Sequence, residues 1–437
     1  MNSSDKQNVE TAAQSLLDAS PHYVDSVSEI SESHVLCATD DIVSASGIKL
    51  VARGSQIDKR LIEKLSDHRL SSTQLERNIS IRGGVTTESL ALDTARLIDD
   101  EAWFKVLAAK SGDPVDMRHG LSRLKLPDEI LFRLTVAREK RPELYHHSLV
   151  VSIISQYLAL RLKLKQAVID KLLIAALCHD LGELYTNPAI LEPGHQITED
   201  ERRFIYVHPI TGWLIVRNLP GLDPDIAKAI IQHQERLDGS GYPNGLKEDA
   251  IGQIGRILAA ADISASIMVR FRDHRRLSTL LRLNSKKYDR QLIDLLHEAI
   301  LAETPSTAQL ERQELTNRFS GLAKLLDAWS HLRANPETAE TAPVIFLTER
   351  MYNLRTVVLS FGFDPDSFEV PLELAEEDAE IAAELAAVID ELQFQLKELR
   401  LEIDRHSASW AETLDPLAFA ALNQWLDLGR SASARKP

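Results

Sequence analysis

The feature that most constrains the fold is a run of almost entirely apolar residues, Val168 to Cys178, that ends in a histidine and an aspartate. A helix that is apolar on nearly every side belongs at the centre of a helical bundle. His179 and Asp180 follow the run directly, and burying such groups is costly unless they are paired or bound to something. The sequence therefore predicts a buried helix with a polar site at its end.

Length and composition extend this prediction to the whole chain. With 437 residues the chain is too long for one ordinary core, so we expect two or three domains. Aromatic residues make up only 5%, whereas Leu, Ala, Ile and Glu, which suit helices, are abundant. We predict a mainly α protein, an all-helical bundle with a small N-terminal α/β module and a helical C-terminal extension.

The N-terminal third divides into three segments. Residues 1–32 are polar and acidic and are predicted to form a mobile or loosely helical leader. Residues 33–82 contain short strand-like pieces around Ser46-Gly47 and Arg53-Gly54, followed by a helical piece, which indicates a small α/β module. A hinge at Gly83-Gly84 leads into a helical linker region at 83–141.

The rest of the chain divides into a helical domain at 142–300 and a helical C-terminal region at 301–437. Within the latter, apolar residues recur at steps of three and four, which predicts a long amphipathic helix. They are Ile381, Leu385, Val388, Leu392, Leu396, Leu399 and Ile403. We interpret this helix as packing on its own chain, and a self-associating coiled coil is the alternative.

Charge and cysteine content exclude several kinds of partner. Lys and Arg number 50 against 65 Asp and Glu, a net charge of −15, which argues against a broad cationic surface for nucleic acid or anionic membranes. No apolar run approaches the roughly 18 residues of a spanning helix. The two cysteines, Cys37 and Cys178, form no disulfide framework. We predict a cytoplasmic protein that binds neither DNA nor membrane.

A series of histidines and acidic residues follows the helices of the 142–300 domain. Glu143 and His147 are four residues apart and so share a helix face, which the adjacent His146 does not. His208 precedes a proline within a helical run, and His233 ends the helix that Asp223-Pro224 begins. A single such histidine is most often structural.

Taken together, these histidines and carboxylates indicate more than any one of them does alone. Asp262 adds a carboxylate in an Ala-rich helix, where only a satisfied carboxylate is cheap to bury. Nitrogen and oxygen ligands from successive helices are the ordinary way to build a metal site inside a bundle. The sequence therefore indicates a metal centre inside the 142–300 domain.

One loop, Asp238 to Gly245, follows His233 closely. Gly239 and Gly241 permit close backbone approach, Tyr242 offers a ring and a hydroxyl, and Pro243 stiffens the exit. From Pro142 to Ile300 the chain resembles an HD-GYP domain, the branch of the HD superfamily of metal phosphohydrolases that hydrolyses cyclic di-GMP in bacterial second-messenger signalling. The matching stretches are HHSLVVS, AALCHDLGELYTNPAIL, HPITGWLIV, IIQHQERLDGSGYPNGL and GRILAAADI.

The resemblance implies an HD-type helical bundle and assigns roles by position. His179 and Asp180 are the implied catalytic pair. The implied metal ligands are Glu143, His147, His179, Asp180, His208, His233 and Asp262. They would hold two divalent ions, or three with Glu143, and their nitrogen and oxygen atoms suit iron or manganese. The implied substrate-binding residues are Gly241 and Tyr242, with Arg270 and Arg272 as candidate cations.

Three positions depart from the family pattern. Gln234 stands where a second consecutive histidine is usual, Glu183 where a phosphate-binding lysine is usual, and Ala265 where an aspartate is usual. Two hypotheses therefore stay open, a cyclic di-GMP phosphodiesterase and a catalytically degenerate module that senses a ligand or binds a protein. Another phosphohydrolase substrate is a third. The flanking regions are candidates for binding a signalling partner or for forming a homodimer.

Overall fold

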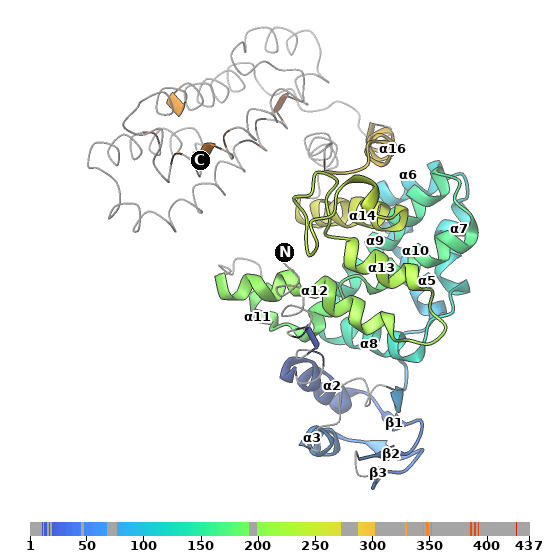
Figure 1. Cartoon of the computed structure of the whole chain (residues 1–437). Coiled ribbons are helices and arrows are strands. Elements are labelled where there is room, and N and C mark those ends of the chain that lie inside the picture. The colour runs from blue at the N-terminus through green and yellow to red at the C-terminus, as the bar shows by residue number, and fades with distance from the viewer. Residues whose placement is uncertain are drawn as a thin grey trace, which may run out of the picture. The chain divides into compact units, whose positions relative to one another are not determined.

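The structure, a computed structural model, describes residues 20–44, 48–67, 77–191, 199–271 and 287–301, together with isolated positions elsewhere. The chain forms two compact units, residues 1–272 with 286–303, and residues 273–285 with 304–437. All described helices and strands longer than a few residues lie in the first unit (Figure 1). This unit is mainly helical with a small sheet module, which confirms the predicted fold class.

The described part of the N-terminal module contains two small antiparallel sheets and two helices. The three-stranded sheet has the order β4-β1-β5, with Leu36 opposite both Ile57 and Ile81. Strands β2 and β3 form a separate pair. The elements are α2 (Pro21–Ser33), β1 (Leu36–Ala38), β2 (Ile42–Val43), β3 (Lys49–Val51), β4 (Gln56–Ile57), α3 (Lys59–Asp67) and β5 (Ile79–Ile81).

The bundle is built around two long central helices, α9 (Pro142–Arg161) and α10 (Gln166–Cys178). Helix α10 buries every residue from Leu172 to Cys178, as its apolar sequence predicts, and packs on α9, α13 and α14. The region expected to be a linker instead packs on α9. Its elements are α5 (Thr87–Asp100), α6 (Ala102–Lys110), α7 (Pro114–His119), η1 (Gly120–Arg123) and α8 (Asp128–Lys140).

The second half of the bundle closes over the end of α10. Helix α13 begins as its sequence predicts, since the Asp223 carboxylate accepts from the backbone N–H of Asp225 and Pro224 occupies the first turn. Pro209 lies inside α12, directly after His208. The elements are η2 (Leu181–Tyr185), α11 (Pro188–Leu191), α12 (Glu199–Arg217), α13 (Pro224–Gln232), η3 (Glu248–Ala250), α14 (Gln253–Phe271) and α16 (Arg290–Leu301).

The polar leader ends in an ordered helix that docks on the bundle. Helix α2 buries Tyr23, Val27 and Ile30 and packs on α3, α8 and η2. The Tyr23 ring stacks on Tyr185 of η2 with centroids 4.5 Å apart, and Ser20 Oγ donates to the Tyr185 carbonyl at 2.8 Å. The N-terminal module therefore contacts the segment that follows His179-Asp180 directly.

The predicted C-terminal amphipathic helix falls largely outside the described residues. Four of its residues, Leu385, Ala386, Ile389 and Leu392, are described, and all four are helical and buried. The rest of that helix lies outside the described residues. Among the helices that are described, none is long and apolar enough to cross a membrane.

Candidate metal centre

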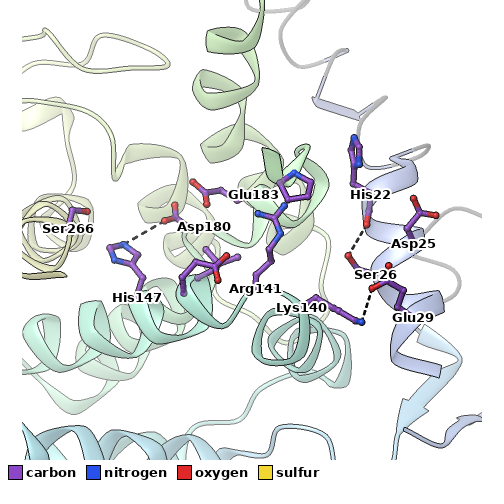
Figure 2. A pocket seen from close by; sticks show the side chains of 13 residues that line it. His22, Asp25, Ser26, Glu29, Lys140, Arg141, His147, Asp180, Glu183 and Ser266 are labelled. Atoms are coloured by element: carbon purple, nitrogen blue, oxygen red, sulfur yellow. Dashed lines mark hydrogen bonds and ion pairs between the residues drawn. The ribbon is translucent and has the colours of Figure 1, made fainter. Parts of the chain in front are cut away.

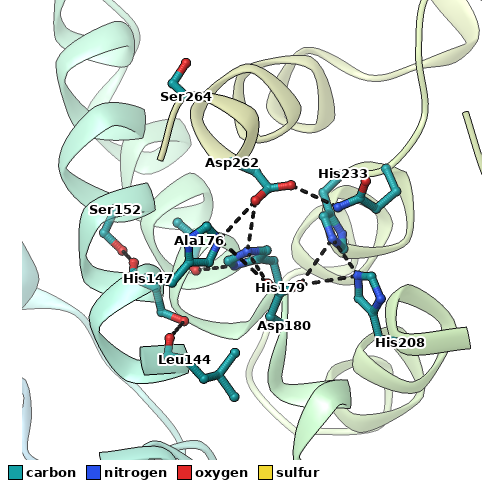
Figure 3. A network of polar contacts seen from close by, with 12 residues as sticks. Leu144, His147, Ser152, Ala176, His179, Asp180, His208, His233, Asp262 and Ser264 are labelled. Carbon is teal, nitrogen blue, oxygen red and sulfur yellow. Dashed lines mark hydrogen bonds and ion pairs between the residues drawn. The ribbon is translucent and has the colours of Figure 1, made fainter. Parts of the chain in front are cut away.

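Six side chains from five segments meet at the end of α10 (Figure 3). They form two groups that share Asp180, and within each group the potential ligand atoms lie within 4.8 Å of one another. The first group is His147, His179, Asp180 and Asp262, and the second is Asp180, His208 and His233. Asp180 is only 8% exposed, and His179 and His233 are fully buried.

The two carboxylate oxygens of Asp180 face different groups. Its Oδ2 lies 3.0 Å from His179 Nε2 and 3.7 Å from His147 Nε2. Its Oδ1 lies 3.3 Å from His208 Nε2 and 3.4 Å from His233 Nε2. Asp180 is therefore placed to bridge two cations, one in each group. Asp262 completes the first group, with Oδ1 3.0 Å from His147 Nε2.

Backbone carbonyls fix the orientation of two of the imidazoles. Nδ1 of His179 lies 2.8 Å from the Ala176 carbonyl, and Nδ1 of His233 lies 2.6 Å from the Ile230 carbonyl. Because a carbonyl accepts only, each Nδ1 carries the proton and donates. In the neutral rings, Nε2 then presents a lone pair toward Asp180. This is the arrangement by which proteins prepare histidines for metal binding.

The contacts among the clustered side chains leave polar atoms unsatisfied, which is a test of whether a metal ion fits. Within the described part of the chain, His179 Nε2 and Asp180 Oδ1 are buried without a hydrogen-bond partner. The 3.0 Å approach of His179 Nε2 to Asp180 thus lacks hydrogen-bond geometry. Lone pairs and a carboxylate that converge in a buried site call for a cation between them. The donor set fits divalent metal ions.

Electrostatics point the same way. Burial lowers the pKa of His179, but the Asp180 and Asp262 carboxylates override this and raise it well above its ordinary value. Burial raises the pKa of Asp262, but the hydrogen bond from His147 and the nearby His179 imidazole lower it well below its ordinary value. The cluster thus stabilises negative charge on its carboxylates and positive charge opposite them, whether a proton or a metal ion supplies it.

The structure gives Gln234 a definite contact. Its Nε2 donates to Asp262 Oδ2 at 2.9 Å, and its Oε1 accepts from Arg236 Nη2 at 3.0 Å. Arg236 therefore fixes which end of the amide faces Asp262. The residue at the predicted degenerate position orients a carboxylate of the first group through its side-chain nitrogen.

Ala265 and Glu183, the other two positions that depart from the family pattern, differ in their access to the cavity. Ala265 is fully buried on α14 and offers the cluster no ligand atom. Glu183 lies in η2 on the wall of the cavity beside the cluster. Burial, followed by the nearby Asp180 carboxylate, raises the pKa of Glu183 to about 8. Glu183 is therefore protonated at neutral pH when no metal is bound.

Glu143 is on the same helix face as His147, as predicted, but its exposed carboxylate belongs to neither group of ligand atoms. It lines the cavity beside them. His146 is exposed, so the choice of His147 over His146 agrees with the placement of both rings. The third metal ion expected from Glu143 keeps only the sequence resemblance as its support.

The loop after His233 is held by a carboxylate that the sequence analysis did not assign. Glu235 is buried, and its two oxygens accept from the backbone N–H groups of Asn244 and Leu246 at 2.7 and 2.8 Å. A side chain at Gly241 would overlap the backbone of residues 234–236, so only glycine fits there. The close approach that Gly241 permits is to its own chain.

Of the other predicted substrate-binding residues, the structure describes Tyr242 and Arg270 but not Arg272. The Tyr242 ring packs edge-on against Tyr206, with centroids 4.6 Å apart, and lies 6.3 Å from the ring of His208. Arg270 is in the last turn of α14, and Arg272 lies outside the described residues. Substrate binding by these residues and by Gly241 stays a prediction.

A cavity of about 890 Å³ opens beside the first group (Figure 2). His147, Asp180 and Glu183 line one side, and Arg141 and Lys140 lie between them and helix α2, which contributes His22, Asp25, Ser26 and Glu29. Sequence reasoning did not single out Arg141 or the α2 residues. No local pattern marks them, because only the docking of α2 brings them to the cavity.

Comparison with known proteins bears on the same region. Residues 134–292 match the family model described as "HD domain". This part of the chain is an HD domain. All six clustered side chains lie within it. The resemblance to HD-GYP domains expected from the sequence is confirmed for this region.

The relatives of the HD domain are named for cyclic-dinucleotide hydrolysis. A cyclic di-GMP phosphodiesterase of Pseudomonas aeruginosa is 27% identical over 169 residues, covering 36% of this chain and 40% of the relative. The cyclic di-GMP phosphodiesterase PdeB of Borreliella burgdorferi is 29% identical, covering 36% and 43%. A 3'3'-cGAMP-specific phosphodiesterase of Vibrio cholerae is 34% identical over 119 residues, covering 27% of each chain. The chain spans less than half the length of these relatives.

Proposed function

We propose that the protein is a metal-dependent phosphodiesterase that hydrolyses cyclic di-GMP. The observation that carries the proposal is the placement of Asp180, whose two oxygens face two separate histidine groups inside an HD domain. Paired metal sites that share a ligand suit in-line displacement at phosphorus, because both the attacking and the leaving oxygen are stabilised.

The residues divide between two metal sites. His147, His179, Asp180 and Asp262 would hold one ion, and Asp180, His208 and His233 the other. With imidazole and carboxylate ligands and no thiolate, iron or manganese is the expected metal. When bound, such ions activate water at neutral pH and neutralise charge on phosphoryl oxygens.

Other groups of the protein orient the metal ligands, and a cavity beside them gives a substrate access to the site. The Ala176 and Ile230 carbonyls hold His179 and His233 in position, and Gln234 holds Asp262. The cavity beside the first group is large for a mononucleotide and lies near the upper end of the roughly 300–1,000 Å³ typical of ligand pockets. These features support a cyclic dinucleotide as the substrate class.

The alternative is a degenerate domain that binds a dinucleotide or a protein without turnover. Gln234 and Glu183, in place of the usual histidine and lysine, are the residues that favour it. A protein partner, a homodimer and a cytoplasmic location remain predictions of the sequence. Within cyclic dinucleotides, the names of the relatives favour testing both cyclic di-GMP and 3'3'-cGAMP.

The test is hydrolysis of both dinucleotides by anaerobically purified protein loaded with Fe²⁺ or Mn²⁺. The inactive control carries His179→Ala and Asp180→Ala together. A second pair compares His147→Ala with His146→Ala, since only the first ring lies in the cluster. We expect turnover that the double change and His147→Ala abolish and that His146→Ala retains. No turnover of either dinucleotide in metal-replete protein overturns the phosphodiesterase and leaves the degenerate domain.

A further inference from the structure

The cavity beside the metal centre contains a guanidinium that the ligand set does not use. Arg141 is only 8% exposed and lines the same cavity as His147, Asp180 and Glu183. It is placed at the junction of α8 and α9, where its backbone N–H closes α8 and its carbonyl begins α9. Helix ends therefore fix its backbone, while its side chain points toward the cavity (Figure 2).

The hydrogen-bonding capacity of Arg141 is largely uncommitted. A guanidinium carries five N–H donors. Among the described residues, this group makes one hydrogen bond, from Nη2 to the Thr186 carbonyl at 3.0 Å. No nitrogen of Arg141 is among the buried, unsatisfied atoms of the described residues, so its other donors are accessible from the cavity that it lines.

Nearby acidic groups of the described residues do not supply a partner anion to Arg141. Glu183 and Glu143 line the same cavity as Arg141, but among the described residues neither forms an ion pair with it. The neighbouring Lys140 differs, because its Nζ is paired with Glu29 Oε2 of α2 at 2.8 Å. Arg141 is thus the cation of this wall that keeps its donors for a ligand.

We infer that Arg141 forms an anion subsite next to the metal centre and binds a phosphate group of the substrate. The inference deepens the proposed function, on which its choice of a dinucleotide phosphate rests. A guanidinium suits this role because two parallel N–H groups match two phosphate oxygens. Because Arg141 lies between the cluster and α2, it is a residue that positions the substrate. It also supplies a cation to this cavity, which Glu183 does not.

The first arm of the test uses inorganic phosphate and protein stripped of metal, so that the metal ions contribute nothing to binding. Phosphate affinity is measured by calorimetry for the wild type, Arg141→Ala, Arg141→Lys and the control Arg138→Ala. Arg138 is on the same helix and is bound to Glu139 and the Gly83 carbonyl. We expect Arg141→Ala to weaken phosphate binding roughly tenfold or more, and Arg138→Ala to leave it unchanged. Equal binding by wild type and Arg141→Ala, or none by the wild type, overturns the subsite.

The second arm uses metal-loaded protein and cyclic di-GMP. Arg141→Ala should raise KM roughly tenfold to a hundredfold at unchanged metal content, with Arg141→Lys in between because it keeps charge without the fork. If Arg141→Ala does not fold, as judged by circular dichroism, the comparison rests on Arg141→Lys. A KM unchanged in both variants overturns the inference while the phosphodiesterase stands. Phosphate binding that depends on Arg141, in a protein without turnover, overturns the proposed function and keeps the anion subsite.

Discussion

Gln234 Nε2 donates to Asp262 Oδ2 at 2.9 Å, while the other oxygen of Asp262 lies 3.0 Å from His147 Nε2. The amide is held in this orientation by Arg236, which donates to Oε1. Gln234, which departs from the family pattern, therefore orients the Asp262 carboxylate through the oxygen that faces away from His147. Groups that orient metal ligands in this way contribute to metal affinity although they never touch the ion.

The first prediction concerns this contact. Gln234→Ala should weaken Mn²⁺ binding roughly tenfold, the lower end of what loss of a ligand-orienting hydrogen bond costs. Gln234→His should instead strengthen it, because an imidazole can add a ligand nitrogen. Calorimetric titration of metal-stripped protein measures both. Unchanged affinity in Gln234→Ala would show that Asp262 needs no support from this amide.

The second prediction concerns Glu183, whose pKa is about 8 in the folded, metal-free protein against an ordinary value near 4.5. Between these two pH values the folded state holds a proton that the unfolded state has lost. The free energy of unfolding should therefore fall as pH rises through this window, by at most about 1.4 kcal/mol per pH unit.

Glu183→Gln removes that dependence, so the variant should gain stability relative to wild type as pH rises from 5 to 8. Urea unfolding at several pH values in the presence of a chelator measures the difference, and the exposed Glu101→Gln serves as the control. Parallel wild-type and Glu183→Gln profiles would contradict the raised pKa of this carboxyl group.

The third prediction concerns the loop after His233. A Cβ at Gly241 would overlap the backbone of Gln234, Glu235 and Arg236, so Gly241→Ala should cost about 1–3 kcal/mol of stability. It should also displace Gln234 and so weaken metal binding. Gly252→Ala is the matched control, because its nearest neighbour would be Gln232 Oε1 at 3.4 Å. Thermal unfolding compares the two, and equal melting temperatures would count against the close backbone approach.

The fourth prediction concerns the docking of α2. Tyr23 is 2% exposed and stacks on Tyr185, so Tyr23→Ala should lower the free energy of unfolding by about 3 kcal/mol. Tyr23→Phe keeps the ring and should cost much less. Hydrogen exchange in η2 should also quicken in Tyr23→Ala, because Tyr185 belongs to that segment. Unchanged hydrogen-exchange rates in η2 would mean that the docking of α2 does not stabilise this segment.

The sequence could predict those parts of the molecule that follow from local periodicity and spacing. The almost entirely apolar run from Val168 to Cys178 places His179 and Asp180 at the end of a buried helix, and the four-residue step from Glu143 selects His147 over His146. Local spacing does not tell how deep a side chain points from its helix, so it does not show that the Glu143 carboxylate stays outside the cluster.

The contacts of Arg141 and Tyr23 depend on segments distant in sequence. Arg141 contacts Thr186, 45 residues away, and Tyr23 stacks on Tyr185 after a docking that the polar leader does not signal. Such relationships arise from tertiary packing and carry no periodic pattern. Glu235 is intermediate, because its position beside the loop is visible in the sequence, whereas its two backbone partners are not.

The most direct test of the two-metal phosphodiesterase is an anaerobic titration of metal-stripped protein with Mn²⁺, in which bound metal and cleavage of cyclic di-GMP are followed together. We expect two ions to bind per chain and cleavage to appear as the second binds. Asp180→Asn should lose both metal binding and cleavage, since Asp180 faces both groups. Two bound ions without cleavage of cyclic di-GMP, or full cleavage by Asp180→Asn, would contradict the account.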